Sequence, residues 1–202
     1  MNLFEPNAPL KNGTLWVVEE APGLVVGNDM TDQIRMGYWG SFNIPYFPEM
    51  YAWMGYPAMR EKFGNYFTHD LCPRAQIFRR DEGKVVDLET LKMQMRYNNF
   101  RSDPYSIDTT GKPNPMYAIC SRGDLKAKAP SAGGCYDTKV TSFKYGAKDL
   151  KAQALNGPTE GKYSGGHLPP FSFEGPFAKN EHMGLPLTFA FDFVPVAPKS
   201  PK

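Results

Sequence analysis

The pattern that most constrains the fold lies near the C-terminal end, where large apolar residues occupy every second position. These residues are Leu187, Phe189, Phe191 and Phe193. Because successive side chains of a β-strand point to opposite faces, this spacing predicts one strand with a wholly apolar inner face. We therefore expect all four side chains to face a shared core.

Shorter patterns predict further elements. Apolar, β-branched and aromatic runs predict strands over residues 14–19, 76–79, 116–120 and 137–145. Helices are expected over residues 30–39, with Asp29 or Thr31 as the cap, and over 57–64, 87–97 and 147–155. Asp87 is the expected cap of the third of these helices. Residues 103–114 and 160–180 are expected to be mostly loop, because glycines and prolines interrupt them.

Proline and glycine are abundant, with 19 of each among 202 residues, which favours long ordered loops over a helical bundle. Strands and helices alternate irregularly, and this favours an α+β fold built on antiparallel sheet. The length predicts a single domain over residues 1–202, or the C-terminal portion of a larger one. The proline-rich residues 195–202 are expected to form a flexible tail.

Charge and composition argue against several partners. The formal net charge of +2 comes without a basic stripe, so nucleic acid is not an expected partner. No apolar run is long enough for a membrane span. The three histidines lack ligand spacing, so neither a metal nor another cofactor is expected. The first eleven residues lack the apolar core of a signal peptide. Asn12 begins an Asn-Gly-Thr sequon and is a candidate glycosylation site.

Several strings of residues occur in a recognisable order. The strings include Ser41–Phe47, Cys72–Asp81, Met95–Phe100, Gly133–Val140, Asn156–Thr159 and His182–Pro186. Together they resemble the C-terminal third of the phospholipase B-like proteins, which are N-terminal-nucleophile hydrolases. The resemblance runs from about residue 13 to residue 194.

The resemblance implies a fold, an activity and a partner. The implied fold is part of an αββα sandwich, with two antiparallel sheets between helical layers. The implied function is cleavage of an ester or amide bond in an acyl-chain lipid substrate, in a lysosomal or secreted protein. In this family self-cleavage exposes a nucleophilic cysteine, which lies upstream of the region seen here. An upstream segment would therefore have to supply the nucleophile; the alternative is a non-catalytic binding or structural subunit.

The same resemblance suggests catalytic residues. Asn43 is the candidate donor to a tetrahedral oxyanion, and the alternative is an asparagine that caps a turn before Pro45. Arg74 and Arg79 are the candidate cations near the thiol or the substrate head group. On a strand these arginines would point to opposite faces, so only one is expected to face the site. Salt bridges are the alternative role for both.

The remaining motifs have structural explanations. We expect no bond between Cys72 and Cys120, and we consider free thiols more probable than a bond between Cys120 and Cys135. Some relatives carry a cysteine at the position of Met116, paired with the one at Cys120. Arg96, at the end of an expected helix, is interpreted as structural. Aromatic residues between positions 39 and 53 suit an acyl-chain pocket or, more simply, a hydrophobic core.

Overall fold

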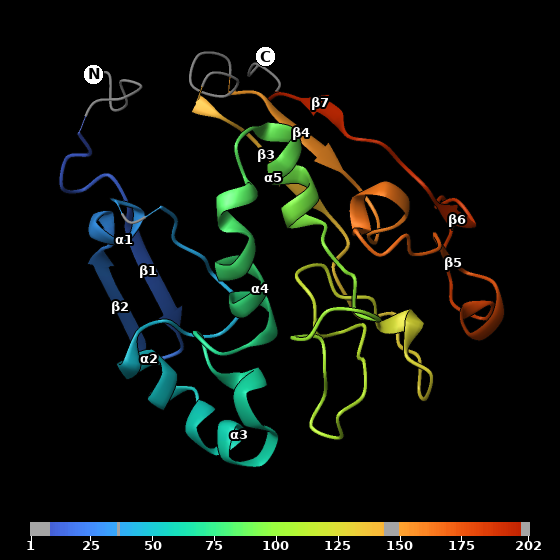
Figure 1. The fold of residues 1–202 in the computed structure, drawn as a ribbon, viewed down its shortest axis with the longest axis horizontal. Helices are drawn as coiled ribbons and strands as arrows, with labels where there is room; N and C mark the ends of the chain where they lie inside the picture. The colour runs from blue at the N-terminus through green and yellow to red at the C-terminus, as the bar shows by residue number, and fades with distance from the viewer. Residues whose placement is uncertain (1–8, 36, 144–149, 199–202) are drawn as a thin grey trace. The chain divides into compact units, whose positions relative to one another are not determined.

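A computed structural model describes residues 9–35, 37–143 and 150–198, and it shows an α+β chain with small antiparallel sheets (Figure 1). The chain forms two compact units, residues 1–82 and residues 83–202, which are considered separately below. None of the described helices is long and apolar enough to cross a bilayer.

The first unit combines one β-hairpin with four short helices. Strands β1 (Trp16–Ala21) and β2 (Leu24–Asp29) pair antiparallel. Strand β1 corresponds to the strand expected over residues 14–19, shifted by two residues. The helices are α1 (Thr31–Arg35), α2 (Pro48–Trp53), α3 (Tyr56–Phe63) and α4 (Pro73–Asp81), with a 3-10 turn, η1, over Gly64–Phe67. At the start of α1, Asp29 accepts hydrogen bonds from the backbone and hydroxyl of Thr31. The expected helices at 30–39 and 57–64 are therefore present, the first of them shorter.

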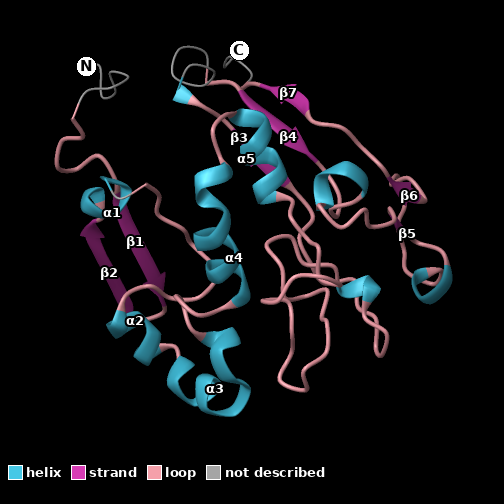
Figure 2. Cartoon of the chain, viewed as in Figure 1, coloured by secondary structure: helices cyan, strands magenta, loops and turns pink. Residues whose placement is uncertain are grey.

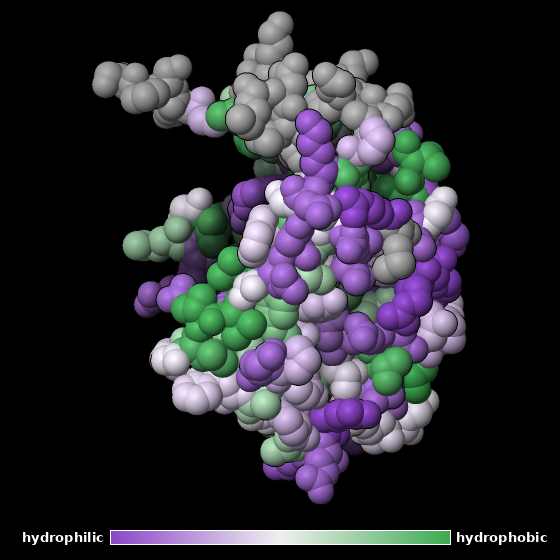
Figure 3. Space-filling model, turned by 90° about the vertical axis from the view of Figure 1, so that its left-hand side faces the viewer, coloured by the Kyte–Doolittle hydropathy of each residue, from purple (hydrophilic) through white to green (hydrophobic). Residues whose placement is uncertain are grey.

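The hairpin has two different faces. Val17 on the inner face packs with Met30, Phe47 and Met50 in a buried cluster. On the other face large apolar side chains are exposed, and Figure 3 shows such side chains in green, seen from the side where the hairpin lies in Figure 1. A second cluster, which includes Phe42 and Cys72, lies against α4.

The expected strand over residues 76–79 is wrong, because this segment lies inside helix α4. Pro73 occupies the first turn, where its missing N–H costs nothing and its fixed φ suits a helix. Ala75 and Ile77 are buried within the helix. Four residues are too few for periodicity to separate a strand from a helix, and the proline was the better signal.

Among its described residues, the second unit contains an α-helix of 8 residues, two small sheets and extensive loops (Figure 2). Helix α5 spans Leu88–Met95, with Asp87 as its cap, as expected, but it ends two residues before Tyr97. Asp87 and Thr90 form a capping box at its start. One sheet has the order β3 (Thr138–Val140), β4 (Ala152–Leu155) and β7 (Val194–Val196), and the other pairs β5 (Phe171–Ser172) with β6 (Thr188–Phe189). Short 3-10 turns occur at Glu82–Lys84 (η2), Gly123–Leu125 (η3), Gly161–Ser164 (η4) and Gly175–Phe177 (η5).

The alternating segment does not form the single inward-facing strand that its pattern predicts. Phe189 alone of the four is buried, whereas Leu187 is 48% exposed and Phe191 is 42% exposed. Only Thr188 and Phe189 pair in β6, and the next strand begins at Val194. Phe189 packs against Phe171 and Phe177, whereas Phe193 is half-buried against the ring of Tyr163, so the row does not share one core.

Four further expectations need correction. Residues 116–120 form turns instead of a strand, because the amides of Tyr117 and Cys120 donate to Asn114 and Tyr97. Residues 152–155 of the expected helix over 147–155 form β4, while 147–149 lie outside the described residues. The expected strand over 137–145 shrinks to β3; residues 144 and 145 are outside the described range. Pro195 and Val196, expected in the tail, pair with β4.

A disulfide joins Cys120 to Cys135, so the preference for free thiols at these positions is wrong. Cys72 is free and buried, and the expectation that it is not bonded to Cys120 is confirmed. The two bonded cysteines close a loop in which Gly123 donates to the carbonyl of Gly133. Sequence spacing alone gives no such pairing, because loop backbone geometry brings the two cysteines together.

Candidate functional site

Asn43 lies in the segment between α1 and α2, in a conformation that few residues adopt. Its φ is 58°, in the left-handed region, and its side chain is exposed between the buried Phe42 and Ile44. Asparagine tolerates this region better than most residues with a side chain. The two apolar neighbours anchor the segment in the core, so that the amide of Asn43 is presented outward.

Arg74, in the first turn of α4, fixes the backbone beside Asn43. Its Nε and Nη2 donate to the carbonyl of Phe42 over 3.2 and 2.6 Å. The guanidinium also lies over the ring of Tyr66, 5.4 Å from its centroid. The Tyr56 hydroxyl donates to the carbonyl of Asn43 itself over 3.4 Å. Side chains from α3 and α4 therefore bind two successive backbone carbonyls, that of Phe42 and that of Asn43.

Arg79 lies on a different side of α4. Five residues along a helix correspond to about 140° of net rotation, so Arg74 and Arg79 do not share a face. The expectation that they diverge is met, but by helix geometry and not by strand alternation. Arg79 Nη2 donates to the carbonyl of Asp70 over 3.1 Å.

Arg79 lines a cleft of about 260 Å³ within the first unit. Aromatic and polar side chains share this lining, among them Tyr38, Trp39, Phe42, Tyr46 and His69. Asn43 and Arg74 are not among the residues that line it. Phe42 connects the two places, because its ring faces the cleft while its carbonyl is held by Arg74.

His69 is the residue of this cleft that sequence analysis did not select. Its Nδ1 lies 2.9 Å from an Asp70 carboxylate oxygen, and its Nε2 lies 3.1 Å from the carbonyl of Gly40. The imidazole thereby connects the segment before α4 to the segment before Asn43. No spacing in the sequence indicates this contact, since Gly40 is 29 residues away.

Electrostatics in the cleft are mixed. Burial raises the pKa of the Tyr38 hydroxyl, and the carboxylate of Glu82 adds to this shift while Arg79 opposes it. Trp39 Nε1 is buried and has no hydrogen-bond partner among the described residues. The cleft therefore offers one cation and two carboxylates beside aromatic rings.

None of the three cysteines is an activated nucleophile. Burial raises the pKa of the Cys72 thiol, and its Sγ donates to the carbonyl of His69 over 3.4 Å. Cys120 and Cys135 are joined in the disulfide. A catalytic thiol needs a lowered pKa and access to substrate, so none of these residues has the required surroundings.

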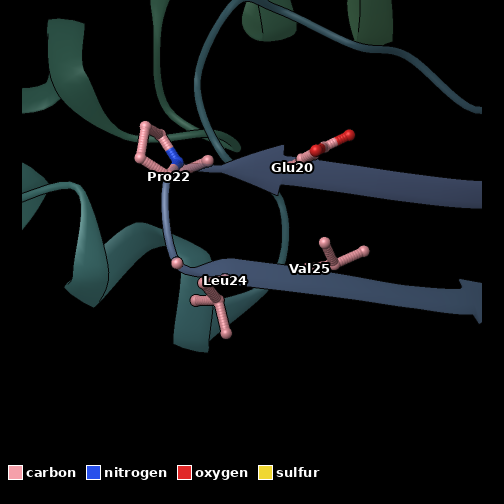
Figure 4. Close-up of a pocket in the computed structure, with 6 residues that line it drawn as sticks. Glu20, Pro22, Leu24 and Val25 are labelled. Atoms are coloured by element: carbon pink, nitrogen blue, oxygen red, sulfur yellow. The ribbon is translucent and has the colours of Figure 1, made fainter.

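A second hollow, of about 440 Å³, lies at the turn of the hairpin (Figure 4). It is lined by residues 20–25 only, and Glu20 supplies its one ionisable side chain. Without a second polar side chain near Glu20, the hollow has no set of groups that would support catalysis.

In the second unit, two fully buried arginines have a structural role, as interpreted for Arg96. Arg96 donates to the carbonyls of Gly157 and Pro158, each over 2.8 Å, and burial lowers its pKa to about 10. Arg122 donates to the carbonyl of Thr159 over 2.5 Å and forms an ion pair with Asp124. Both guanidinium groups therefore bind backbone carbonyls of the same unit, and that of Arg122 also binds the Asp124 carboxylate.

Asn12, the candidate glycosylation site, is exposed near α1. Its side-chain oxygen accepts a hydrogen bond from Arg35 Nη2 over 3.0 Å. This contact lies at the surface, and Thr14 of the same sequon is half-buried.

Comparison with known proteins extends these observations. The phospholipase B family matches residues 1–196. Phospholipase B-like 1 of Bos taurus is 45% identical over 192 residues, covering 95% of this chain and 33% of the bovine protein. Its Homo sapiens counterpart is 44% identical with the same coverage, and phospholipase B of Crotalus adamanteus is 44% identical over 189 residues, covering 94% of this chain and 32% of its own length. The chain therefore spans about a third of the length of the curated relatives it matches.

Proposed function

Because this chain belongs to the phospholipase B family, we propose that it is the C-terminal part of a hydrolase that cleaves an ester or amide bond of an acyl-chain lipid. The nucleophilic cysteine is supplied by an upstream segment, since the three cysteines here are buried or bonded. The names of the relatives support a lipid substrate, and the small antiparallel sheets are compatible with a share of an αββα sandwich.

Asn43 donates to the oxyanion in this proposal. Attack of a thiolate on an acyl carbon places negative charge on the former carbonyl oxygen, and fixed N–H donors stabilise it. The observation that supports the assignment is the pair of hydrogen bonds from Arg74 to the Phe42 carbonyl, which fixes the backbone next to the exposed Asn43. An amide that is positioned before the reaction loses little free energy to reorganisation.

Arg74 acts as a positioning residue, because its guanidinium is occupied by the Phe42 carbonyl. Arg79 is the better placed of the two arginines for a substrate group, since it lines the cleft. Its cation suits a carboxylate or phosphate on the ligand. The aromatic side chains of the cleft then supply an apolar surface for the part of the ligand next to that group.

Position 43 is tested in the enzyme assembled with its upstream segment. Asn43→Gly removes the amide donor while accepting the left-handed φ, so turnover falls by about 10²–10³ without a comparable loss of stability. Asn65→Ala, which alters another exposed asparagine of the same unit, leaves turnover unchanged. Full activity of Asn43→Gly would remove Asn43 from the mechanism.

The second candidate function is a non-catalytic binding or structural subunit. It is favoured by the buried Cys72 and by the occupation of Arg74 by backbone. Intact-mass measurement of the native protein separates the two candidates. An associated upstream chain that begins with cysteine supports the hydrolase, whereas an isolated chain of 22.7 kDa supports the subunit.

Location and modification follow the family assignment. We propose a lysosomal or secreted protein that carries a glycan on the exposed Asn12. Glycosidase treatment of native material, followed by mass measurement of the peptide with Asn12, tests the modification directly. An unmodified peptide in material from a secretory host contradicts it.

A further inference from the structure

The outward side of the β1–β2 hairpin is an exposed apolar surface. Six residues form it, and we call them the outer hairpin face: Trp16, Val18, Glu20, Val25, Gly27 and Asp29. Trp16 is 62% exposed, and Val18 and Val25 are each 63% exposed. The opposite side is packed against the buried cluster around Met50. The strands are thus apolar on both sides, a pattern typical of sheet that is covered on both sides.

The three apolar side chains form one flat surface. Val18 pairs across the hairpin with Gly27, and a Cβ added to Gly27 would lie 3.1 Å from Val18 Cγ2. Val18 therefore leans over Gly27 and fills the place where a side chain is missing. Val25 lies on the same side, opposite Glu20, two pairs closer to the turn. Two-stranded sheets are marginal by themselves, and further covering adds stability.

Charges restrict what covers this face. Glu20 and Asp29 lie at opposite ends of it, and none of its six residues is a lysine or arginine. Asp29 already accepts hydrogen bonds from Gly13 and Thr31, so Glu20 is the carboxylate of this face that a covering surface meets. Two copies stacked face to face would bring no lysine or arginine of the six residues to pair with it. Anionic lipid is disfavoured for the same reason. A fitting surface has an apolar centre and lysine or arginine side chains at its edge.

We infer that the outer hairpin face is the docking surface for the remaining part of the polypeptide, which meets it with an apolar centre and a basic edge. This inference rests on the proposed function only in assuming that such a part exists. The matched relatives support that assumption, since this chain covers 33% of the bovine protein. The remaining two thirds are ample to cover a surface made by six residues.

Co-expression tests the inference. The tagged chain is produced together with the portion of the bovine relative outside the matched third, and the complex is purified through the tag. Val18→Glu places a carboxylate in the apolar centre, so the yield of co-purified partner falls by about tenfold or more. Val25→Glu gives a similar loss. Val86→Glu is the matched control, because Val86 is 80% exposed in the other unit, and it leaves the yield unchanged.

A second readout locates the contact. Hydrogen exchange of the purified complex slows in residues 16–20 and 24–28 relative to the free chain, and circular dichroism confirms that the variants remain folded. The inference is overturned if no partner co-purifies with the native chain, or if Val18→Glu retains the full yield. It is equally overturned if the chain forms dimers, or binds phosphatidylglycerol vesicles, through Val18.

Hydrolysis is scored separately, so the two proposals fail independently. A complex that forms through the hairpin but never cleaves a lipid ester contradicts the proposed function and leaves the docking surface intact. An active complex that tolerates both hairpin substitutions contradicts the docking surface alone.

Discussion

Removal of the disulfide between Cys120 and Cys135 is expected to destabilise the second unit substantially. The bond joins cysteines 15 residues apart. Closing a loop of this length in the unfolded chain corresponds to about 3 kcal/mol of stability in the chain-entropy account. Alanine is the appropriate replacement at both positions, because Cys120 is fully buried and a serine hydroxyl there would lack a partner.

The native loop retains other contacts that do not depend on the disulfide. Gly123 donates to the carbonyl of Gly133, and Cys135 donates to the carbonyl of Ser121. These contacts hold the native loop together in the double variant, so the loss acts mainly through the unfolded state. The free energy of unfolding should therefore fall by about 3 kcal/mol, with little change in the native structure.

Amide exchange in urea measures this change within the second unit. The amide of Asn98, which donates to the carbonyl of Ser164, and the amide of Cys120, which donates to Tyr97, report on it. With a urea m-value of about 2 kcal/mol/M, the transition moves down by about 1.5 M. Cys72→Ala is the control for a lost sulfur without a lost bond. An unchanged transition in the double alanine variant would refute the loop-closure argument.

Three other predictions follow from single residues. Gly157→Ala should cost about 2 kcal/mol or more in the free energy of unfolding, because φ is +101° and the new Cβ would lie 2.9 Å from Phe189 Cδ1. Gly184→Ala, at φ +77° with open space around it, shows the backbone cost alone, and equal losses in urea melts would disprove the clash. Hydrogen bonds from Thr90 lower the pKa of Asp87, so its contribution to stability is present above the carboxyl's ordinary pKa and is lost as pH falls through the lowered value. NMR titration of Asp87, with Asp87→Asn as a pH-insensitive control for α5, checks this. Cys72, with its buried thiol and raised pKa, should react with iodoacetamide only after unfolding, and rapid labelling of the native chain would contradict its burial.

Elements that depend on local signals could be predicted from the sequence. Asp87 and Thr90 satisfy each other's backbone groups within one helical turn, so the start of α5 needs no distant partner. The helix over 57–64 similarly has a proline in its first turn and a glycine at its end. The α+β class also follows from the sequence, because it requires only that short strands and helices alternate irregularly.

Elements that depend on distant partners could not be predicted in this way. Alternation at positions 187–193 suits a buried strand, but Leu187 and Phe191 are exposed in the described part of the second unit. The contact between Arg74 and the Phe42 carbonyl spans 32 residues and arises from a helix that was expected to be a strand. Its catalytic meaning, with that of Asn43 and Arg79, stays a prediction. The disulfide was missed because a pair of cysteines carries no information on loop geometry.

Three consecutive residues at the end of α5 bear on how the second unit tolerates insertions and deletions. Arg96 holds residues 157 and 158, the Tyr97 carbonyl accepts from Cys120, and Asn98 binds Ser164 and Pro115. Two separate stretches of the chain, residues 115–120 and 157–164, thus take their positions from one helix end.

One residue added to α5 would turn this helix end by about 100° and move it by about 1.5 Å, which breaks all of these contacts at once. The turn over 108–111 is different, because Asp108 and Gly111 bond each other and a lengthened turn there disturbs few other residues. Homologous sequences should therefore vary in length at the turn and keep a fixed length through α5. The end of α5 thus sets the spacing of the segments that bind it, and it thereby restricts changes in the length of the chain during evolution.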